Sequence, residues 1–255
     1  MRQYTDVNPT LLLIRPAGSN DQLAGAFTAL GWPVIERPLT RITSVDEGVD
    51  DRRLAMSLDR FDHVIFVSQH AVLTGLPRLA AFWSQWPSGL RWYAVGERTA
   101  MILENEGAPE VLFPAVSGST GLLSLQPLVD AADSAVLIVK GEDGLDDLEN
   151  TLLERQARVE NLTTYRRELC NGDRVEHQIN GYVVPVYNSS VLPGLKSVLM
   201  DVPDHHQVLV AVSERIAEAA TAIGFKKVLI SSGLEQIAVA TCIESARRWL
   251  PYDKP

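Results

Sequence analysis

The chain has 255 residues, of which 46% are hydrophobic and 22% charged, and this is enough apolar material for one large core or two modest ones. No window approaches the roughly 20 apolar residues that a membrane span needs, and the start "MRQYTDVNPT" lacks the layout of a signal peptide, so a cytoplasmic location is expected. The net charge of −9, with no basic run longer than a pair, argues against nucleic acid or an anionic membrane as partner.

Short apolar runs alternate with helical periods along the chain, in the order strand then helix. Strands are expected at "TLLLIRP" (10–16), "HVIFVS" (63–68), "WYAVG" (92–96), "EVLFP" (110–114), "AVLIVKG" (135–141), "GYVVPVY" (181–187), "QVLVAVS" (207–213) and "KVLIS" (227–231). Such runs are typical of parallel sheets with helices on both faces. The predicted fold class is α/β.

Two pairs of segments repeat without a gap. Residues 94–114, "AVGERTAMILENEGAPEVLFP", match 211–231, "AVSERIAEAATAIGFKKVLIS", at eight positions. The stretch from Leu11 matches the stretch from Val136, which makes Arg15 equivalent to Lys140 and Thr40 equivalent to Tyr165. Chance similarity between strand-helix-strand segments is the alternative. Because both pairs occur in the same order, one α/β unit used twice is the preferred interpretation.

Small polar residues follow several of the predicted strands and open the next helix. They are Ser68 with Gln69, Gly96 to Thr99, Ser189 with Ser190, and Ser213. Neither repeat has a G-x-G-x-x-G or a G-x-x-x-x-G-K-[ST] loop, so a nucleotide-phosphate site is not expected. Backbone amides at these helix starts could hold carboxylates instead. The alternative for each side chain is an ordinary helix N-cap.

Cysteine and histidine give no indication of a metal site. Cys170 and Cys242 are far apart and outside any C-x-x-C motif, and the five histidines lack ligand spacing. Neither a metal nor a cofactor is expected.

The order of four motifs resembles that of the uroporphyrinogen-III synthase family over nearly the whole chain. The motifs are an opening strand ending in Arg15-Pro16, then "FVSQHAV", then "AVGERTA" with a downstream glycine, then "VKGEDGLDDLENTLLERQARVENLTTYRR" ending in Tyr-Arg. The sequence departs from the family pattern at Leu145, where such enzymes often carry arginine, and at Ser213 to Ile216, where they carry a Gly-x-x-Thr-Ala segment.

The resemblance implies two similar lobes joined by a two-stranded linker. Residues 1–37 with 172–255 would form one discontinuous α/β domain and residues 42–163 the other, with linker strands at 38–41 and 164–171. A plain tandem split near residue 130 is what the repeat alone would suggest.

The resemblance also implies a reaction, in which the linear tetrapyrrole hydroxymethylbilane closes to uroporphyrinogen III with inversion of ring D. No cofactor is implied. Tyr165 aligns with the family's functional tyrosine, and we expect it to be the general acid; the alternative is a packing aromatic. Arg15 and Lys140 are expected to contact substrate carboxylates, with plain salt bridges as the alternative. A contact with the preceding enzyme of the pathway is a further expectation.

Two other functions fit the same sequence. One is a two-lobed α/β module that binds an anion or a tetrapyrrole without turnover, and the other is a diverged homologue that has lost activity. Fold alone does not separate these from an enzyme.

Overall fold

The structure is a computed structural model that describes residues 8–142 and 147–250. The chain divides into two compact units. Unit 1 comprises Met1–Arg41 with Glu168–Pro255, and unit 2 comprises Ile42–Arg167. Unit 1 is therefore discontinuous in sequence, and the chain passes twice between the units.

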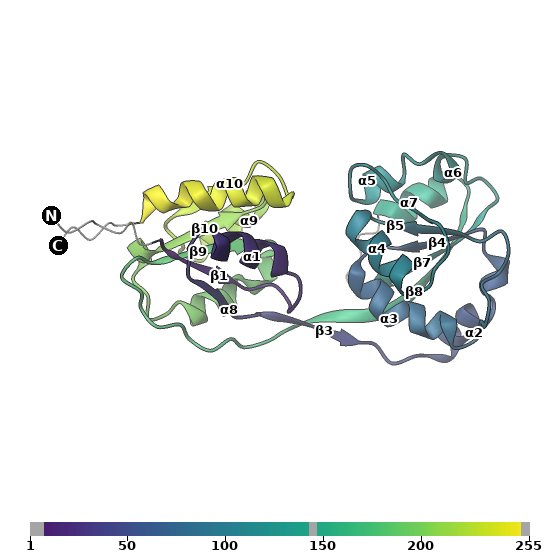
Figure 1. Ribbon diagram of the computed structural model, residues 1–255, viewed down its shortest axis with the longest axis horizontal. Helices are drawn as coiled ribbons and strands as arrows, with labels where there is room; N and C mark the ends of the chain where they lie inside the picture. The colour runs from purple at the N-terminus through teal and green to yellow at the C-terminus, as the bar shows by residue number, and fades with distance from the viewer. Residues whose placement is uncertain (1–7, 143–146, 251–255) are drawn as a thin grey trace. The chain divides into compact units, whose positions relative to one another are not determined.

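Unit 1 is built around a five-stranded parallel sheet (Figure 1). Its strands are β1 (Thr10–Leu13), β2 (Val34–Glu36), β9 (Tyr182–Val186), β10 (Gln207–Ala211) and β11 (Val228–Ile230). Its helices are α1 (Asp21–Ala29), α8 (Leu192–Val198), α9 (Glu214–Ala222) and α10 (Gln236–Ala246), with short 3₁₀ turns η2 (Ser189–Val191), η3 (Asp204–His206) and η4 (Arg247–Trp249).

Unit 2 contains the second sheet. Its strands are β4 (His63–Phe66), β5 (Arg91–Ala94), β6 (Val111–Leu112), β7 (Ala135–Gly141) and β8 (Arg158–Leu169), with β3 (Thr40–Ser44) added at the β8 edge. Its helices are α2 (Val49–Met56), α3 (Gln69–Ala80), α4 (Glu97–Asn105), α5 (Ser119–Leu122), α6 (Gln126–Val129) and α7 (Asp147–Glu154), with a 3₁₀ turn η1 (Leu58–Arg60).

Alternating residues of the central strands of unit 2 bury themselves on opposite faces of the sheet. Phe66 and Val139 pack with α2, α3 and α4, whereas Ile65 and Ile138 pack with α5, α6 and α7. Figure 1 shows the two groups of helices on either side of the strands. Burial on both faces explains why these strands are continuous apolar runs without polar alternation.

Apart from the added edge strand β3 of unit 2, the two sheets have the same strand order, which confirms the prediction of two similar lobes. Unit 1 reads β11-β10-β9-β1-β2, and unit 2 reads β6-β5-β4-β7-β8. β1 thus corresponds to β7 and β10 to β5, as the repeated segments predict. The α/β fold class is confirmed as well.

The two passages between the units lie side by side. The amide of Val45 donates to the carbonyl of Thr164, and the amide of Cys170 donates to the carbonyl of Leu39, so the chains here run antiparallel. The guanidinium of Arg41 bonds the carboxylate of Glu168 at 2.9 Å. β8 continues without a break from unit 2 to Leu169, so the expected linker segment 164–171 is not a strand of its own.

Each sheet has one point at which the chain reverses its direction of strand addition. In unit 2, β4 leads outward to β5 and β6, while β7 leads outward to β8 on the other side. In unit 1 the reversal lies between β1 and β9. Because the loops after the two central strands separate at such a point, a crevice forms at the carboxyl ends of those strands.

Candidate functional site

A cavity of about 230 Å³ lies in unit 2 at the carboxyl ends of β4, β5, β7 and β8. It therefore occupies the crevice expected at the reversal point. The cavity is smaller than the roughly 300–1,000 Å³ of typical ligand pockets, so it would hold only part of a large substrate. Its lining combines apolar side chains with a few polar ones: Val67, Ser68, Val95, Gly118, Ser119, Ile138, Lys140, Gly141, Glu142, Leu148, Glu149, Tyr165 and Arg167.

Tyr165 reaches this cavity because of an irregularity in the pairing of β7 with β8. Lys140 pairs with Thr163, but Gly141 pairs with Tyr165, so Thr164 is one extra residue on β8. Such a bulge redirects the side chains that follow it. Thr164 is fully buried, and its hydroxyl accepts from Thr74 of α3 at 2.8 Å. Tyr165, only 4% exposed, consequently lies on the same side of the sheet as Thr164.

Gly141 leaves room for the ring of Tyr165. A Cβ atom at Gly141 would lie 2.7 Å from ring atoms of Tyr165, closer than side chains tolerate. The edge of the His70 imidazole meets the ring from α3, with 5.7 Å between centroids. The ring of Tyr165 thus packs against Gly141 and His70, and its hydroxyl lies beside Ser68 at the start of α3.

Ser68 combines two contacts at the start of α3. It is the N-cap residue, and its hydroxyl oxygen accepts from the amide of Ala71 at 3.0 Å. The same oxygen lies 2.9 Å from the hydroxyl of Tyr165. Ser68 is therefore a helix N-cap, and it also contacts Tyr165, the expected general acid. Gln69 is the first residue of the helix and does not itself line the cavity.

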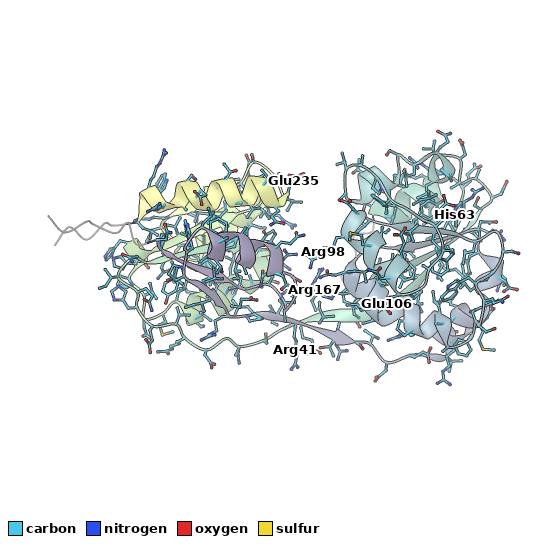
Figure 2. All side chains as sticks on the ribbon, in the orientation of Figure 1. Arg41, His63, Arg98, Glu106, Arg167 and Glu235 are labelled. Carbon is cyan, nitrogen blue, oxygen red and sulfur yellow. The ribbon has the colours of Figure 1, made fainter. Side chains whose placement is uncertain are left out.

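Charged groups of both signs surround the cavity. Lys140 is 8% exposed, and its ammonium lies 3.8 Å from the carboxylate of Glu149 on α7. Arg167 follows Tyr165 by two residues and also lines the cavity. Figure 2 shows Arg167 and Arg98 at one edge of unit 2, the carboxyl edge of its sheet, and His63 at the opposite edge. Lys140 and Arg167 thus bring positive charge to the cavity wall.

Besides Gln69, two further expected contact residues of unit 2 are absent from the cavity wall. Thr99 is buried within α4 at 6% exposure. Gly96 is the N-cap of α4, and a side chain there would collide with Ser117. Packing against the following loop accounts for Gly96. The loop itself brings Gly118 and Ser119 to the cavity, which sequence reasoning missed although "SGST" (117–120) has the composition of a strand-end turn.

Unit 1 carries its own set of residues at its reversal point. The guanidinium of Arg15 lies 4.5 Å above the ring of Tyr187, and it also donates to the carbonyl of Ser19 at 3.0 Å. Burial raises the pKa of Tyr187, and the positive charge of Arg15 opposes that shift. Tyr187, like Gly118 and Ser119, is a residue that the sequence did not reveal.

Asn188, and not the serines that follow it, makes the side-chain cap in unit 1. Its side chain accepts from the amide of Ser190 at 2.9 Å, and Ser189 and Ser190 lie within η2. Val186 in β9 and Phe66 in β4 hold matching positions in the two sheets. Asn188 follows Val186 by two residues and Ser68 follows Phe66 by two, so Asn188 is equivalent to Ser68. Ser213 is at the N-cap position of α9 but forms no side-chain cap bond.

His63 illustrates a buried polar pair away from the cavity. Its Nδ1 lies 3.1 Å from the hydroxyl of Tyr93 at the amino edge of the sheet. Burial is the main cause that lowers the pKa of His63, and the charge of Arg91 adds to it. Position and burial both assign His63 to the core.

The described residues offer neither a metal site nor a membrane-spanning helix. Residues 8–142 and 147–250 contain no cluster of three or more histidine, cysteine, aspartate or glutamate side chains arranged to hold a metal ion. Within the same ranges, no helix combines the length and apolar character that crossing a membrane requires.

Comparison with known proteins gives a consistent result along the chain. The family model described as uroporphyrinogen-III synthase HemD matches residues 21–238. The chain belongs to the uroporphyrinogen-III synthase family. It is 26% identical to the uroporphyrinogen-III synthase of Salmonella typhimurium over 251 residues, which cover 92% of this chain and 100% of the relative. It is 24% identical to that of Escherichia coli over 245 residues, with the same coverage of both chains.

Two solved uroporphyrinogen-III synthase structures share the fold. The Helicobacter pylori structure has a TM-score of 0.56 and 15% identity, and covers 93% of this chain and 99% of its own. A mutant Thermus thermophilus structure has a TM-score of 0.52 and 15% identity, with coverages of 94% and 98%.

The departures from the family pattern fall in two places. Leu145 lies outside the described residues. Ser213 to Ile216 form the start of α9 in unit 1, where Ile216 is buried at 3% exposure and packs into the core.

Proposed function

We propose that this member of the uroporphyrinogen-III synthase family converts hydroxymethylbilane into uroporphyrinogen III, inverting ring D as the macrocycle closes. The observation that carries the proposal is a family match over residues 21–238 together with a cavity at the reversal point of unit 2 that contains Tyr165. Membership supports the reaction class, and the cavity beside Tyr165 supports the proposed location of the chemistry.

Tyr165 is the proposed general acid. The acid protonates the hydroxyl group on ring A. The carbon–oxygen bond then breaks, and the group leaves as water with the electron pair of that bond. The pyrrole nitrogen lone pair stabilises the resulting azafulvene cation, which the substituted carbon of ring D attacks to give a spiro intermediate. After rearrangement, a proton lost from a ring carbon restores the acid. One water is released in total.

Most of the acceleration would come from positioning, because the leaving group departs readily and the carbon centres need only be held in the right order. Ile138 and Leu148 provide an apolar wall against which a pyrrole face could rest. Lys140 and Arg167 provide positive charge for acetate or propionate side chains. In unit 1, Arg15 would serve a carboxylate of another ring.

The instability of the substrate affects where the enzyme works and which protein it contacts. Hydroxymethylbilane closes spontaneously to isomer I, so a short path from the preceding enzyme would preserve it for this reaction. A cytoplasmic location and a direct contact with that enzyme are therefore parts of the proposal.

Multiple turnover tests the proposal against a binding module. The substrate should be generated in situ, and its loss followed at a protein concentration about one hundredth that of the substrate. An enzyme consumes many equivalents per protein molecule faster than the spontaneous reaction does. If the loss matches the spontaneous rate, or if only one equivalent is affected, the chain binds the tetrapyrrole without converting it.

A further inference from the structure

Ser68 lies between the first turn of a helix and the proposed acid. Its oxygen accepts from the amide of Ala71 at 3.0 Å and lies 2.9 Å from the hydroxyl oxygen of Tyr165. α3, which it caps, has 12 residues, so its N-terminus carries the positive end of a substantial helix dipole. Both oxygens belong to residues that line the cavity.

The hydrogen-bonding capacity of a serine hydroxyl limits what Ser68 can do. It has one proton and two acceptor lone pairs, and the amide of Ala71 occupies one lone pair. If Ser68 donates its proton to Tyr165, the phenol proton is left for a ligand in the cavity. The donors then form a chain in one direction, from the amide of Ala71 through Ser68 to Tyr165, and bonds in such a chain strengthen one another.

We propose that Ser68 is a positioning residue for Tyr165, and not a direct contact to substrate carboxylates. It directs the phenol proton into the cavity and donates to the phenol oxygen as negative charge develops there. This inference rests on the proposed function, because it matters only if Tyr165 gives up a proton.

Because packing fixes the ring of Tyr165, the hydrogen bond between Ser68 and Tyr165 sets the direction of the phenol proton. Gly141 and His70 both pack against the ring. The remaining degree of freedom is rotation of the hydroxyl proton about the carbon–oxygen bond. During the reaction the proton passes from the Tyr165 oxygen to the departing hydroxyl, Ser68 keeps its own proton and donates to the phenolate, and the proton released at ring closure returns to Tyr165.

A double-mutant cycle measures the coupling. Ser68→Ala should lower kcat about five- to tenfold, the scale of one hydrogen bond, with KM changed less than twofold. In the Tyr165→Phe background, the same substitution should lower kcat less than twofold further. A merely structural cap would lower both backgrounds equally, and that result would overturn the inference.

Two conservative variants separate the cap from the donor. Ser68→Thr keeps both the cap and the donor, so its kcat should lie within about threefold of the wild type. Ser68→Asp keeps the cap but, as a carboxylate, cannot donate. Its thermal stability should match the wild type while kcat stays as low as in Ser68→Ala. Recovery of kcat in Ser68→Asp would show that capping alone matters.

A measurement without turnover checks the contact itself. With tyrosine labelled with carbon-13 at Cζ, the Tyr165 resonance is identified by its loss in Tyr165→Phe. Ser68→Ala should move it, and Ser68→Thr should leave it nearly in place. An unmoved resonance in Ser68→Ala overturns the inference even if the enzyme is active. Absence of turnover by the wild type would instead refute the proposed function and, with it, the catalytic part of this role.

Discussion

Tyr165 reaches the cavity because β8 contains one extra residue, the polar Thr164. Thr164 is fully buried and bonds to Thr74, while its carbonyl accepts from the amide of Val45 and from Arg78. In the sequence, "LTTYRR" indicates a strand that runs toward solvent, and residue alternation would place Thr164 and Tyr165 on opposite faces. The motif identified the tyrosine. The bulge that aims it depends on packing against α3, which no local pattern encodes.

Tyr165→Phe tests the tyrosine as an acid because it keeps the ring and removes only the donor. General acid assistance is worth about 10²–10⁴ in rate, and we expect a fall in kcat of about 10² or less because the leaving group is good. KM should change little, since the interaction strengthens in the transition state. Steady-state kinetics gives both values. Thr40→Ala, at the equivalent position of the other repeat, is the control and should be neutral. Full kcat in Tyr165→Phe would make Tyr165 a packing residue.

Gly141→Ala tests the close approach behind the ring. The added Cβ would stand 2.7 Å from the Tyr165 ring, so we expect a loss of about 1–3 kcal/mol in unfolding free energy and a fall in kcat at least as large as that of Tyr165→Phe. Urea unfolding and kinetics measure the two effects. Gly25→Ala is the matched control: apart from its chain neighbours and the backbone of its own helix α1, no atom lies within 4 Å of its Cβ position, and the change should stabilise by about 0.5–1 kcal/mol. Unchanged stability and kcat in Gly141→Ala would contradict this packing.

At the scale of elements, every strand expected from an apolar run is present. The strands expected at 135–141 and 207–213, for example, are β7 (Ala135–Gly141) and β10 (Gln207–Ala211). These strands can be predicted from the sequence because strands covered on both faces need apolar residues at successive positions. The helix starts were harder to interpret. Whether a serine caps, as Ser68 does, or leaves the cap to Asn188 depends on where the backbone turns.

Proline at the first position of α3 tests whether its amides bind substrate. Gln69 occupies this position, where proline is compatible with the helix because the amide has no partner within it. Gln69→Pro should therefore fold normally. Gln69 does not line the cavity, so KM rises only if substrate binding brings a carboxylate to its amide, a hydrogen bond worth about 1.5–3 kcal/mol. Kinetics and thermal unfolding report the two properties. Val49→Pro, at the first position of α2, is the control. If both variants keep the wild-type KM, the amide of Gln69 does not face a substrate carboxylate.

At the scale of the whole molecule, the hydrophobic pattern predicts the repeat but does not predict how the chain connects the two units. Shared hydrophobic pattern and matching residues predicted two similar units, because both sheets bury the same positions. Hydrophobic pattern could not predict that the first strand-helix-strand segment joins the last third of the chain, since a tandem split satisfies the same periodicity. The family resemblance supplied that arrangement. Unit boundaries at Arg41–Ile42 and Arg167–Glu168 lie at the two adjacent passages of the chain.

Adjacent passages predict that each unit can fold alone. Residues 42–167 are continuous and have two core clusters of their own. In unit 1, Arg41 and Glu168 are bonded at 2.9 Å, so a short turn could replace the whole of unit 2. Both fragments should give dispersed amide spectra and cooperative urea unfolding. A fragment that is collapsed, with no cooperative transition, would show that its core depends on the other unit.

The isomer composition of the product tests the central claim most directly. Hydroxymethylbilane generated in situ should be incubated with and without the protein, and the uroporphyrin isomers separated after oxidation. Spontaneous closure gives isomer I, so the account predicts that isomer III becomes the main product when the protein is present, in proportion to protein concentration. A mixture that stays isomer I at every protein concentration would contradict the assignment of this chain as a working uroporphyrinogen-III synthase.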